Sequence, residues 1–541
     1  MSPQSSFVPP VSPAGPQGKS APSEDGDERK PRTLILCFDG TASQYDGDNT
    51  NVVKLYSLLQ KDDDNDQQLC YYQPGVGTYF NPGMVSPLFQ WGAKILDEAF
   101  AWYLDAHVRG GYQFLMQNYA AGDRICLFGF SRGAYTARAL AGMLHKIGLL
   151  PRDNMEQIPF AYKLYTKTDK DSLALAAGFK QTFCRTVEIE FVGVWDTVAS
   201  VGVLMSRTLP FTTANATIKK FRHALALDEH RVKFLPNFYH RDTTAQKASV
   251  SYKQPGSAAP KGSSAKSPSH SLFGKSRRSA AQVQRNKMQQ NKNNTKLREG
   301  QSPTDSTSSD AVAEALGDGI PGGTDVLEVW FSGCHTDVGG GSVADDVTVS
   351  LSDITLRWMV REVVQAQCGI AFDEAALARA NIPESIFRGV GFPLPSQTII
   401  SHTPRHHKHP VPEEEAMSSS SAEDSNSSDQ PQLKIQAPPA PSGQTGDDSL
   451  DAKADALQPT HDAFKSSPAW WLLEIVPISY PWQQASGKWK NIWWLHLGRG
   501  RQVPVDAPLK IHETVRERMQ DPSLKYTPRA KWTAGTETWV S

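Results

Sequence analysis

The chain has 541 residues, of which 39% are hydrophobic, and a formal net charge of −1 at pH 7. This near-neutral balance creates no overall field that would attract nucleic acid, so no nucleic-acid partner is expected. The absence of any run of about 18 apolar residues argues against a membrane-spanning helix. The N-terminal stretch lacks the basic start and apolar run of a secretory signal, and the six cysteines form no C-x-x-C pair. We therefore expect a cytoplasmic protein without a metal site or cofactor.

Three polar, low-complexity segments interrupt the chain. Residues 1–30 are rich in Pro, Ser and Gly and bury too little apolar surface to fold. Residues 243–323 carry only Lys and Arg as charges between Lys247 and Arg298, and residues 402–465 are rich in Ser and acidic side chains. The basic segment is a candidate for binding nucleic acid or phospholipid, but disorder with incidental charge is favoured. We interpret the last two segments as long disordered insertions in one domain that spans 31–541, because added loop length costs little free energy.

Short apolar runs alternate along the chain with stretches of helical periodicity. Continuous apolar runs are typical of strands buried on both faces of a parallel sheet. Their alternation with helices predicts an α/β fold of the α/β-hydrolase type, with a mostly parallel sheet flanked by helices. The predicted strands are Thr33–Phe38, Arg124–Phe128, Val187–Trp195 and Val326–Phe331, and the predicted helices are Asn51–Leu59, Ala93–Tyr119 (broken at Gly110 and Gly111) and Tyr135–Leu144.

The most informative motif is Gly129-Phe130-Ser131-Arg132-Gly133. G-x-S-x-G often arises by chance, but here a predicted strand leads into the motif and a predicted helix follows it at once. Such a turn is sharp, so larger side chains at the two glycines would collide with the flanking strand and helix. The alternative is an ordinary tight turn whose serine caps the helix. We interpret the motif as a nucleophile elbow, with Ser131 as the nucleophile and Gly129 and Gly133 as its small neighbours.

A serine nucleophile needs a base, and the base needs an acid that orients it. The predicted strand that ends at Trp195 is followed by Asp196, and the strand that ends at Phe331 is followed shortly by His335. Taken alone, the aspartate could cap a helix and the histidine could be structural. Together with Ser131 they follow the order serine, acid, histidine that α/β hydrolases require. We therefore expect Ser131, Asp196 and His335 to form a catalytic triad.

An oxyanion hole would complete such a site. One donor is expected to be the backbone N–H of Arg132, which follows the nucleophile. A second is expected from the loop after the first strand, at Gly40 or Thr41, because glycine lets the backbone approach a substrate closely.

Several longer motifs occur in a fixed order: CFDGTASQYDGDNTNV, GDRICLFGFSRGAYTARALAGML, FVGVWDTVASVG, HALALDEHRVKFLP and VWFSGCHTDVGGG. In these motifs the chain resembles the α/β-hydrolase family that includes bacterial type VI secretion phospholipase effectors. That family was first catalogued as a domain of unknown function and is common in fungi. The resemblance covers about residues 32–242, 324–400 and 466–528.

The resemblance implies the same triad of Ser131, Asp196 and His335, with lipid esters, chiefly glycerophospholipids, as substrates. The chain departs from the family at Ala42 and Ser43, where members often carry Trp and Asn, and in its two long insertions. A fungal intracellular paralogue is therefore expected rather than an injected toxin.

Two functions remain open on the sequence alone. The first is a serine ester hydrolase that acts on lipid or other carboxylic esters. The second is a catalytically silent scaffold that binds a membrane or partner through the basic segment and the Trp-rich end. The tryptophans of that end suit a membrane interface, so peripheral membrane contact is an open alternative, but packing against the core is favoured. They are Trp470, Trp471, Trp482, Trp489, Trp493 and Trp494.

Overall fold

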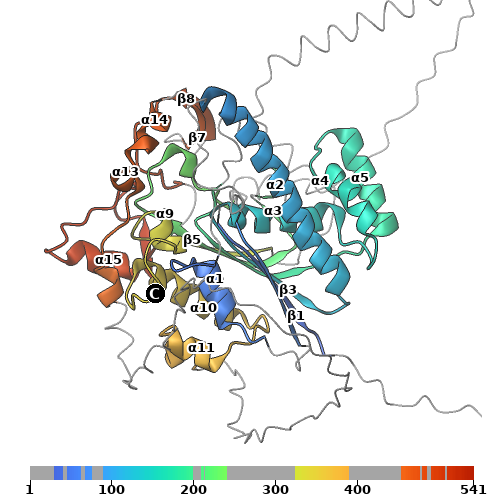
Figure 1. Cartoon of the computed structure of the whole chain (residues 1–541), viewed down its shortest axis with the longest axis horizontal. Coiled ribbons are helices and arrows are strands. Elements are labelled where there is room, and N and C mark those ends of the chain that lie inside the picture. The colour runs from blue at the N-terminus through green and yellow to red at the C-terminus, as the bar shows by residue number, and fades with distance from the viewer. Residues whose placement is uncertain are drawn as a thin grey trace, which may run out of the picture.

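A computed structural model gives the fold and describes residues 30–40, 45–61, 67–75, 89–198, 209–212, 214–239, 323–388, 453–475, 478–483, 489–505 and 509–541. Within these ranges, eight strands form one sheet in the order β10-β9-β6-β5-β4-β3-β1-β2, and helices lie on both of its faces (Figure 1). Every strand pairing in this sheet is parallel. The predicted α/β fold with a parallel sheet flanked by helices is confirmed.

All four predicted strands belong to this sheet, and four more join them. The strands are β1 (Thr33–Phe38), β2 (Gln68–Gln73), β3 (Arg124–Phe130), β4 (Ile189–Trp195), β5 (Ile218–Ala226), β6 (Asp325–Phe331), β9 (Leu509–His512) and β10 (Glu537–Val540). A separate antiparallel pair consists of β7 (Ile478–Gln483) and β8 (Trp489–Trp494).

The sheet separates two cores, as the alternation of side chains along β1 illustrates. Leu34, Leu36 and Phe38 belong to the core under one set of helices, whereas Ile35 and Cys37 belong to the core on the opposite face. The first core is covered by α2 (Phe89–Asn118), α3 (Ser131–Ile147), α4 (Ile158–Tyr165) and α5 (Lys170–Phe183). The second is covered by α1 (Asn51–Leu58), α10 (Leu351–Ala366) and α11 (Glu374–Arg379). The shorter helical elements are η1 (Met155–Gln157), η2 (Val232–Phe234), α9 (His335–Gly339), η3 (Glu384–Phe387), α13 (Ala463–Ser466), η4 (Pro468–Trp470), α14 (Trp471–Glu474) and α15 (Glu513–Gln520).

The predicted break in α2 at Gly110 and Gly111 is wrong, because the helix runs without interruption from Phe89 to Asn118. A Cβ atom on Gly111 would lie only 2.7 Å from the ring of Phe38 in β1. The glycines therefore allow close packing of the helix on the sheet and do not end it.

The sheet joins strands from both sides of the two long low-complexity segments. β5 and β6, on either side of residues 240–322, are paired, and β6 is paired with β9 from beyond residues 389–452. The segment expected at 402–465 ends earlier than predicted, because Ala456 and Phe464 are buried. The predictions for residues 1–29, 243–322 and 402–452 fall outside the described residues. No described helix combines the length and apolarity that crossing a bilayer requires.

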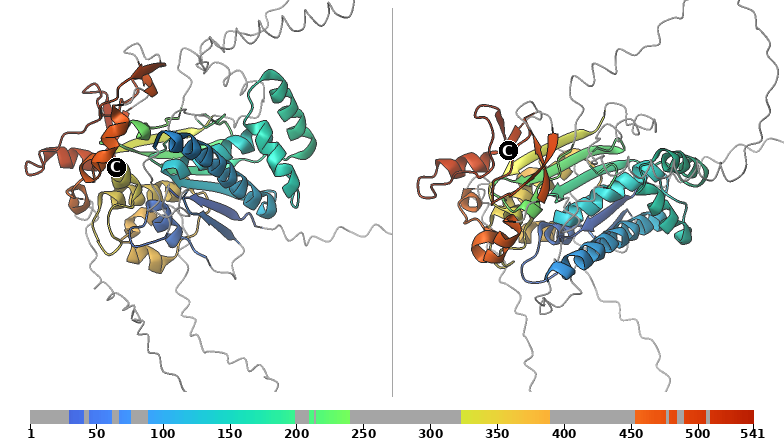
Figure 2. Two further views of the ribbon diagram at one scale, coloured as in Figure 1. Left: turned by 45° about the horizontal axis from the view of Figure 1, so that its top comes forward. Right: turned by 90° about the horizontal axis from the view of Figure 1, so that it is seen from above.

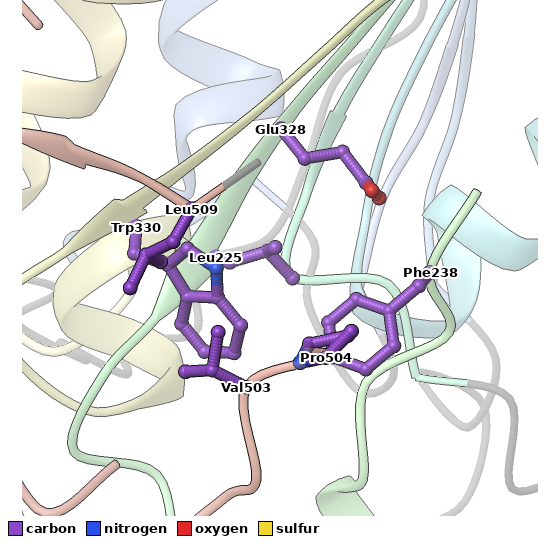
Figure 3. A pocket seen from close by; sticks show the side chains of 7 residues that line it. All are labelled: Leu225, Phe238, Glu328, Trp330, Val503, Pro504 and Leu509. Carbon is purple, nitrogen blue, oxygen red and sulfur yellow. The ribbon is translucent and has the colours of Figure 1, made fainter. Parts of the chain in front are cut away.

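The elements that follow residue 453 gather on one side of the sheet, as the two further views show (Figure 2). They build a third, smaller core against β5 and β6, in which Leu225 and Trp330 belong to one buried cluster with Val503 and Ile511. A small hollow within this cluster has apolar walls and one carboxylate (Figure 3). It is lined by Leu225, Phe238, Glu328, Trp330, Val503, Pro504 and Leu509. The triad candidates do not line it.

Candidate active site

Three polar side chains that are far apart in the sequence meet at the carboxyl ends of the strands. Ser131 follows β3, Asp196 follows β4 and His335 lies a few residues beyond β6. The register pairs Phe130 with Trp195, so the residues that follow these two lie side by side. In open α/β sheets, ligands bind at this edge.

The three side chains form one hydrogen-bonded chain. His335 Nε2 lies 2.8 Å from Ser131 Oγ, and His335 Nδ1 lies 2.6 Å from Asp196 Oδ2. The aspartate is fully buried, while the serine and the histidine are 5% and 4% exposed. Because Nδ1 faces a carboxylate, the neutral imidazole carries its proton there, and Nε2 accepts the hydroxyl proton of the serine.

The serine stands on a turn that only glycine neighbours permit. Ser131 has a φ of 58°, in the left-handed region of backbone conformation that residues other than glycine rarely adopt. A Cβ atom on Gly133 would lie 2.2 Å from the carbonyl oxygen of Phe38, and one on Gly129 would lie 2.6 Å from the carbonyl oxygen of Gly133. The turn is therefore packed tightly between β1 and the first turn of α3.

The imidazole of His335 is held between two aromatic rings. Its centroid lies 4.6 Å from that of Phe130 and 4.8 Å from that of Phe234. Gly339, at the end of α9, packs so closely on Phe130 that a Cβ atom would lie 1.9 Å from the ring. These contacts fix the plane of the imidazole toward the serine.

An arginine that sequence reasoning missed contacts the aspartate. Arg501 Nη1 donates to Asp196 Oδ1 at 2.5 Å, and Nη2 donates to Oδ2 at 2.8 Å. Burial alone would raise the pKa of Asp196, but the charge of Arg501 and the hydrogen bonds from His335 and Arg501 outweigh burial and hold this pKa well below its usual range. The carboxylate therefore stays ionised. The surrounding sequence LHLGRGRQVP carries no motif that would have indicated this role.

The pKa of His335 is shifted in the direction that suits a base. Burial lowers the pKa of this imidazole below 6.5, although the hydrogen bond and charge of Asp196 raise it. The backbone N–H of His335 donates to Glu229 Oε2 at 3.2 Å, and Arg231 pairs with the same carboxylate. Burial would raise the pKa of Glu229, but the hydrogen bonds and charge of Arg231 lower it to about 2. The imidazole of His335 is therefore uncharged at neutral pH. The backbone of His335 is held in place by its hydrogen bond to the carboxylate of Glu229.

The model of one protein family matches residues 32–362, which is more than half of the chain. Its description is T6SS, phospholipase effector Tle1-like, catalytic domain. The chain belongs to this family. Ser131, Asp196 and His335 lie within the matched residues, whereas Arg501 lies outside them.

Three known proteins show similarity to this chain. The uncharacterized protein YEL023C of Saccharomyces cerevisiae (strain ATCC 204508 / S288c) is 29% identical over 555 residues, which cover 87% of this chain and 77% of the yeast protein. An uncharacterized protein from Pseudomonas aeruginosa has a crystal structure that is 18% identical, with a TM-score of 0.31, and covers 66% of this chain. The Tle1 effector bound to the VgrG spike of the type VI secretion system is 20% identical, with a TM-score of 0.22, and covers 38%.

The chain spans 50% and 47% of the lengths of these two solved chains. Structural similarity at this level adds nothing to the family assignment.

The three residues expected to form the oxyanion hole of this Tle1-like chain differ in how well their positions suit that role. Arg132 lies in the first turn of α3, next to the serine. The backbone N–H of Gly40 donates to Asp39 Oδ1 at 2.7 Å, so it already has an acceptor. Asp39 also accepts hydrogen bonds from Thr50 Oγ1 and from Tyr72. Thr41 lies outside the described residues, as do Ala42 and Ser43.

The Trp-rich end of the chain is partly packed and partly exposed. Trp470 packs on Phe234, with ring centroids 5.5 Å apart, and thus adjoins the aromatic contacts of His335. Trp471 contacts Phe464 and is 44% exposed. The side chains of Trp482, Trp489, Trp493 and Trp494 lie outside the described part of the structure. In that part, no group of three or more His, Cys, Asp or Glu side chains is arranged to hold a metal ion.

Proposed function

We propose that the chain is a serine hydrolase that cleaves carboxylic esters, and that its substrates are lipid esters of the phospholipase type. The observation that carries the proposal is the hydrogen-bonded chain from Ser131 through His335 to Asp196. Membership of a family described as phospholipase effectors supports lipid esters as the substrate class.

The proposed reaction proceeds through an acyl-enzyme. Ser131 Oγ attacks the acyl carbonyl while His335 Nε2 takes the hydroxyl proton, and Asp196 stabilises the imidazolium that forms. The imidazolium then protonates the leaving alcohol. His335 next activates a water molecule that attacks the acyl-enzyme, and the carboxylic acid leaves as Ser131 regains its proton. The backbone N–H of Arg132 would stabilise the oxyanion, together with a second donor from the loop after β1, for which the backbone N–H of Thr41 is the candidate because that of Gly40 is bound to Asp39.

A fluorophosphonate probe, which reacts with activated serines, tests this function. The wild-type chain should be labelled, and Ser131→Ala should abolish labelling because no hydroxyl remains to attack phosphorus. Ser57→Ala is the matched control, since Ser57 is exposed on α1 and should leave labelling unchanged. A wild-type chain that is neither labelled nor active on short esters, triglycerides and phospholipids would instead be a non-catalytic scaffold.

We also propose that an exposed apolar surface beside the site contacts the lipid. Leu472 and Ile475 are 63% and 56% exposed, and both lie close in sequence to Trp470, whose ring packs on Phe234. Leu497 is also exposed and lies next to α14, where its N–H donates to the carbonyl of Glu474. Exposed apolar side chains next to a lipid-cleaving site suit an interface with acyl chains.

Vesicle flotation tests this surface. The double change Leu472→Asp with Ile475→Asp should reduce binding to phosphatidylcholine vesicles, because a carboxylate disfavours insertion among acyl chains. Leu175→Asp is the control, since Leu175 is similarly exposed but lies on α5. Equal loss of flotation in both variants, or in neither, contradicts the assignment.

A further inference from the structure

Arg501 is buried at the centre of four hydrogen bonds. Besides its two bonds to Asp196, its Nη1 donates to the carbonyl of Ala226 at 3.0 Å, and its Nη2 donates to the carbonyl of Phe234 at 2.5 Å. The side chain is only 1% exposed. The guanidinium thus joins the acid after β4 to the last residue of β5 and to the segment that carries Phe234.

The carboxylate of Asp196 is fully occupied by donors. Oδ1 accepts from Arg501 and from the backbone N–H of Ala226 at 3.0 Å, and Oδ2 accepts from Arg501 and from His335. A planar guanidinium matches both oxygens of a carboxylate at once. Rotation of the carboxylate away from the imidazole would break both prongs of this pair.

Arg501 also supplies the charge that Asp196 needs. A buried carboxylate without a counter-charge is costly, and the resting imidazole is neutral. Arg231, a second cation close to His335, is engaged by Glu229. Among the described residues, the charged groups near His335 include Asp196, Glu229, Arg231, Arg132 and Arg501, with Lys233 next to Phe234 on η2 and Asp337 on the helix of His335 itself.

The backbone that carries Arg501 is held firmly. The N–H of Lys531 donates to the carbonyl of Arg501 at 3.2 Å. A Cβ atom on the preceding Gly500 would lie 2.1 Å from the carbonyl oxygen of Arg529. The segment around residue 501 therefore packs directly on residues 529–531, which places the guanidinium with little freedom.

We propose that Arg501 is a positioning residue of the active site, which fixes the orientation of the Asp196 carboxylate and balances its charge. Arg501 lies in the C-terminal segment, beyond the residues 32–362 that the family model matches. This segment therefore supplies the side chain that holds the acid of the triad in place. The inference rests on the proposed serine hydrolase function. It has a specific electrostatic consequence: without the guanidinium, the whole charge of Asp196 acts on the imidazole, so His335 should hold its proton to higher pH.

The test uses the full chain and measures the rate of probe labelling at Ser131 between about pH 5 and pH 9, a range that brackets the ordinary histidine pKa. Arg501→Gln removes the charge and one prong, whereas Arg501→Lys keeps the charge but loses the two-pronged geometry. Arg529→Gln is the matched control, because Arg529 lies in the same C-terminal part of the chain but pairs with Asp462. Circular dichroism reports whether each variant folds.

For Arg501→Gln we expect a plateau rate at least about tenfold lower and a labelling midpoint about one pH unit higher. For Arg501→Lys we expect the lower plateau with a midpoint close to that of the wild type. A folded Arg501→Gln variant with the wild-type midpoint overturns the proposal, even if its rate is low. If Arg501→Gln does not fold, Arg501→Lys decides, and a wild-type rate there overturns it. A wild-type chain that is not labelled at all contradicts the proposed function instead.

Discussion

His335 sets the pH dependence of the proposed reaction. The base must be uncharged to accept the hydroxyl proton, and burial lowers its pKa below 6.5. We expect kcat/KM on a soluble short ester to be constant near neutral pH and to fall only as the pH drops through a midpoint below 6.5. A pH–rate profile with its acid midpoint above 6.5 would show that the surroundings raise the pKa of His335, contrary to the effect expected from its burial.

The sequence predicted the candidate site residues that follow strand ends but not Arg501, which does not follow one. The sequence could predict that Ser131, Asp196 and His335 lie close together, because strand ends in a parallel sheet meet at one edge and because the order of the three residues in α/β hydrolases is restricted. Arg501 was missed because its role depends on a contact between residues that are far apart in sequence. Gly40 was expected as an oxyanion donor, and only the structure reveals that its N–H is bound to the side chain of Asp39.

Among the elements, the strand β5 could not be recognised from its sequence. IKKFRHALA reads as too polar for a strand at the centre of a sheet. The structure provides partners for its charges: Lys219 pairs with Glu190, and Arg222 pairs with Glu362 and Asp325. Buried or half-buried charges of this kind are tolerated when they are paired. Their partners lie on other elements, so the sequence of β5 alone does not indicate that it forms a buried strand.

Two helical glycines offer a test of how the elements pack. We expect Gly111→Ala to lower the free energy of unfolding by ~1–3 kcal/mol, because the new methyl group would overlap Phe38. Gly178→Ala, in the exposed middle of α5, meets no atom within 4 Å and should raise stability by up to ~1 kcal/mol, since alanine favours the helix. Thermal unfolding of the two variants beside the wild type measures both effects. Equal behaviour of the two would mean that α2 does not approach β1 as described.

For the whole molecule, we propose one domain that spans residues 31–541 and that residues 243–322 interrupt without helping to form it. The two ends of this segment are already joined, because the hydroxyl groups of Tyr239 and Thr324 lie 3.1 Å apart and each lies 3.1 Å from the carbonyl oxygen of Asn215. A loop whose ends are fixed side by side can be shortened with little effect on stability.

Replacement of residues 243–322 by a short Gly/Ser linker should therefore leave the melting temperature no lower than that of the wild type. Probe labelling of Ser131 should also keep its wild-type rate. A chain that ends at residue 452 provides the contrast, because it lacks β9, β10 and Arg501 and should not be labelled. Loss of folding or labelling on linker replacement would mean that the segment belongs to the domain.

The late position of Arg501 in the chain has a consequence for biosynthesis. The ribosome makes Ser131, Asp196 and His335 first, and long afterwards makes the arginine and the strand β9 that packs beside β6. A nascent polypeptide thus exposes all the reactive groups while their geometry is still incomplete. The proposed activity should begin only when the segment that carries Arg501 has been made and has folded back onto Asp196.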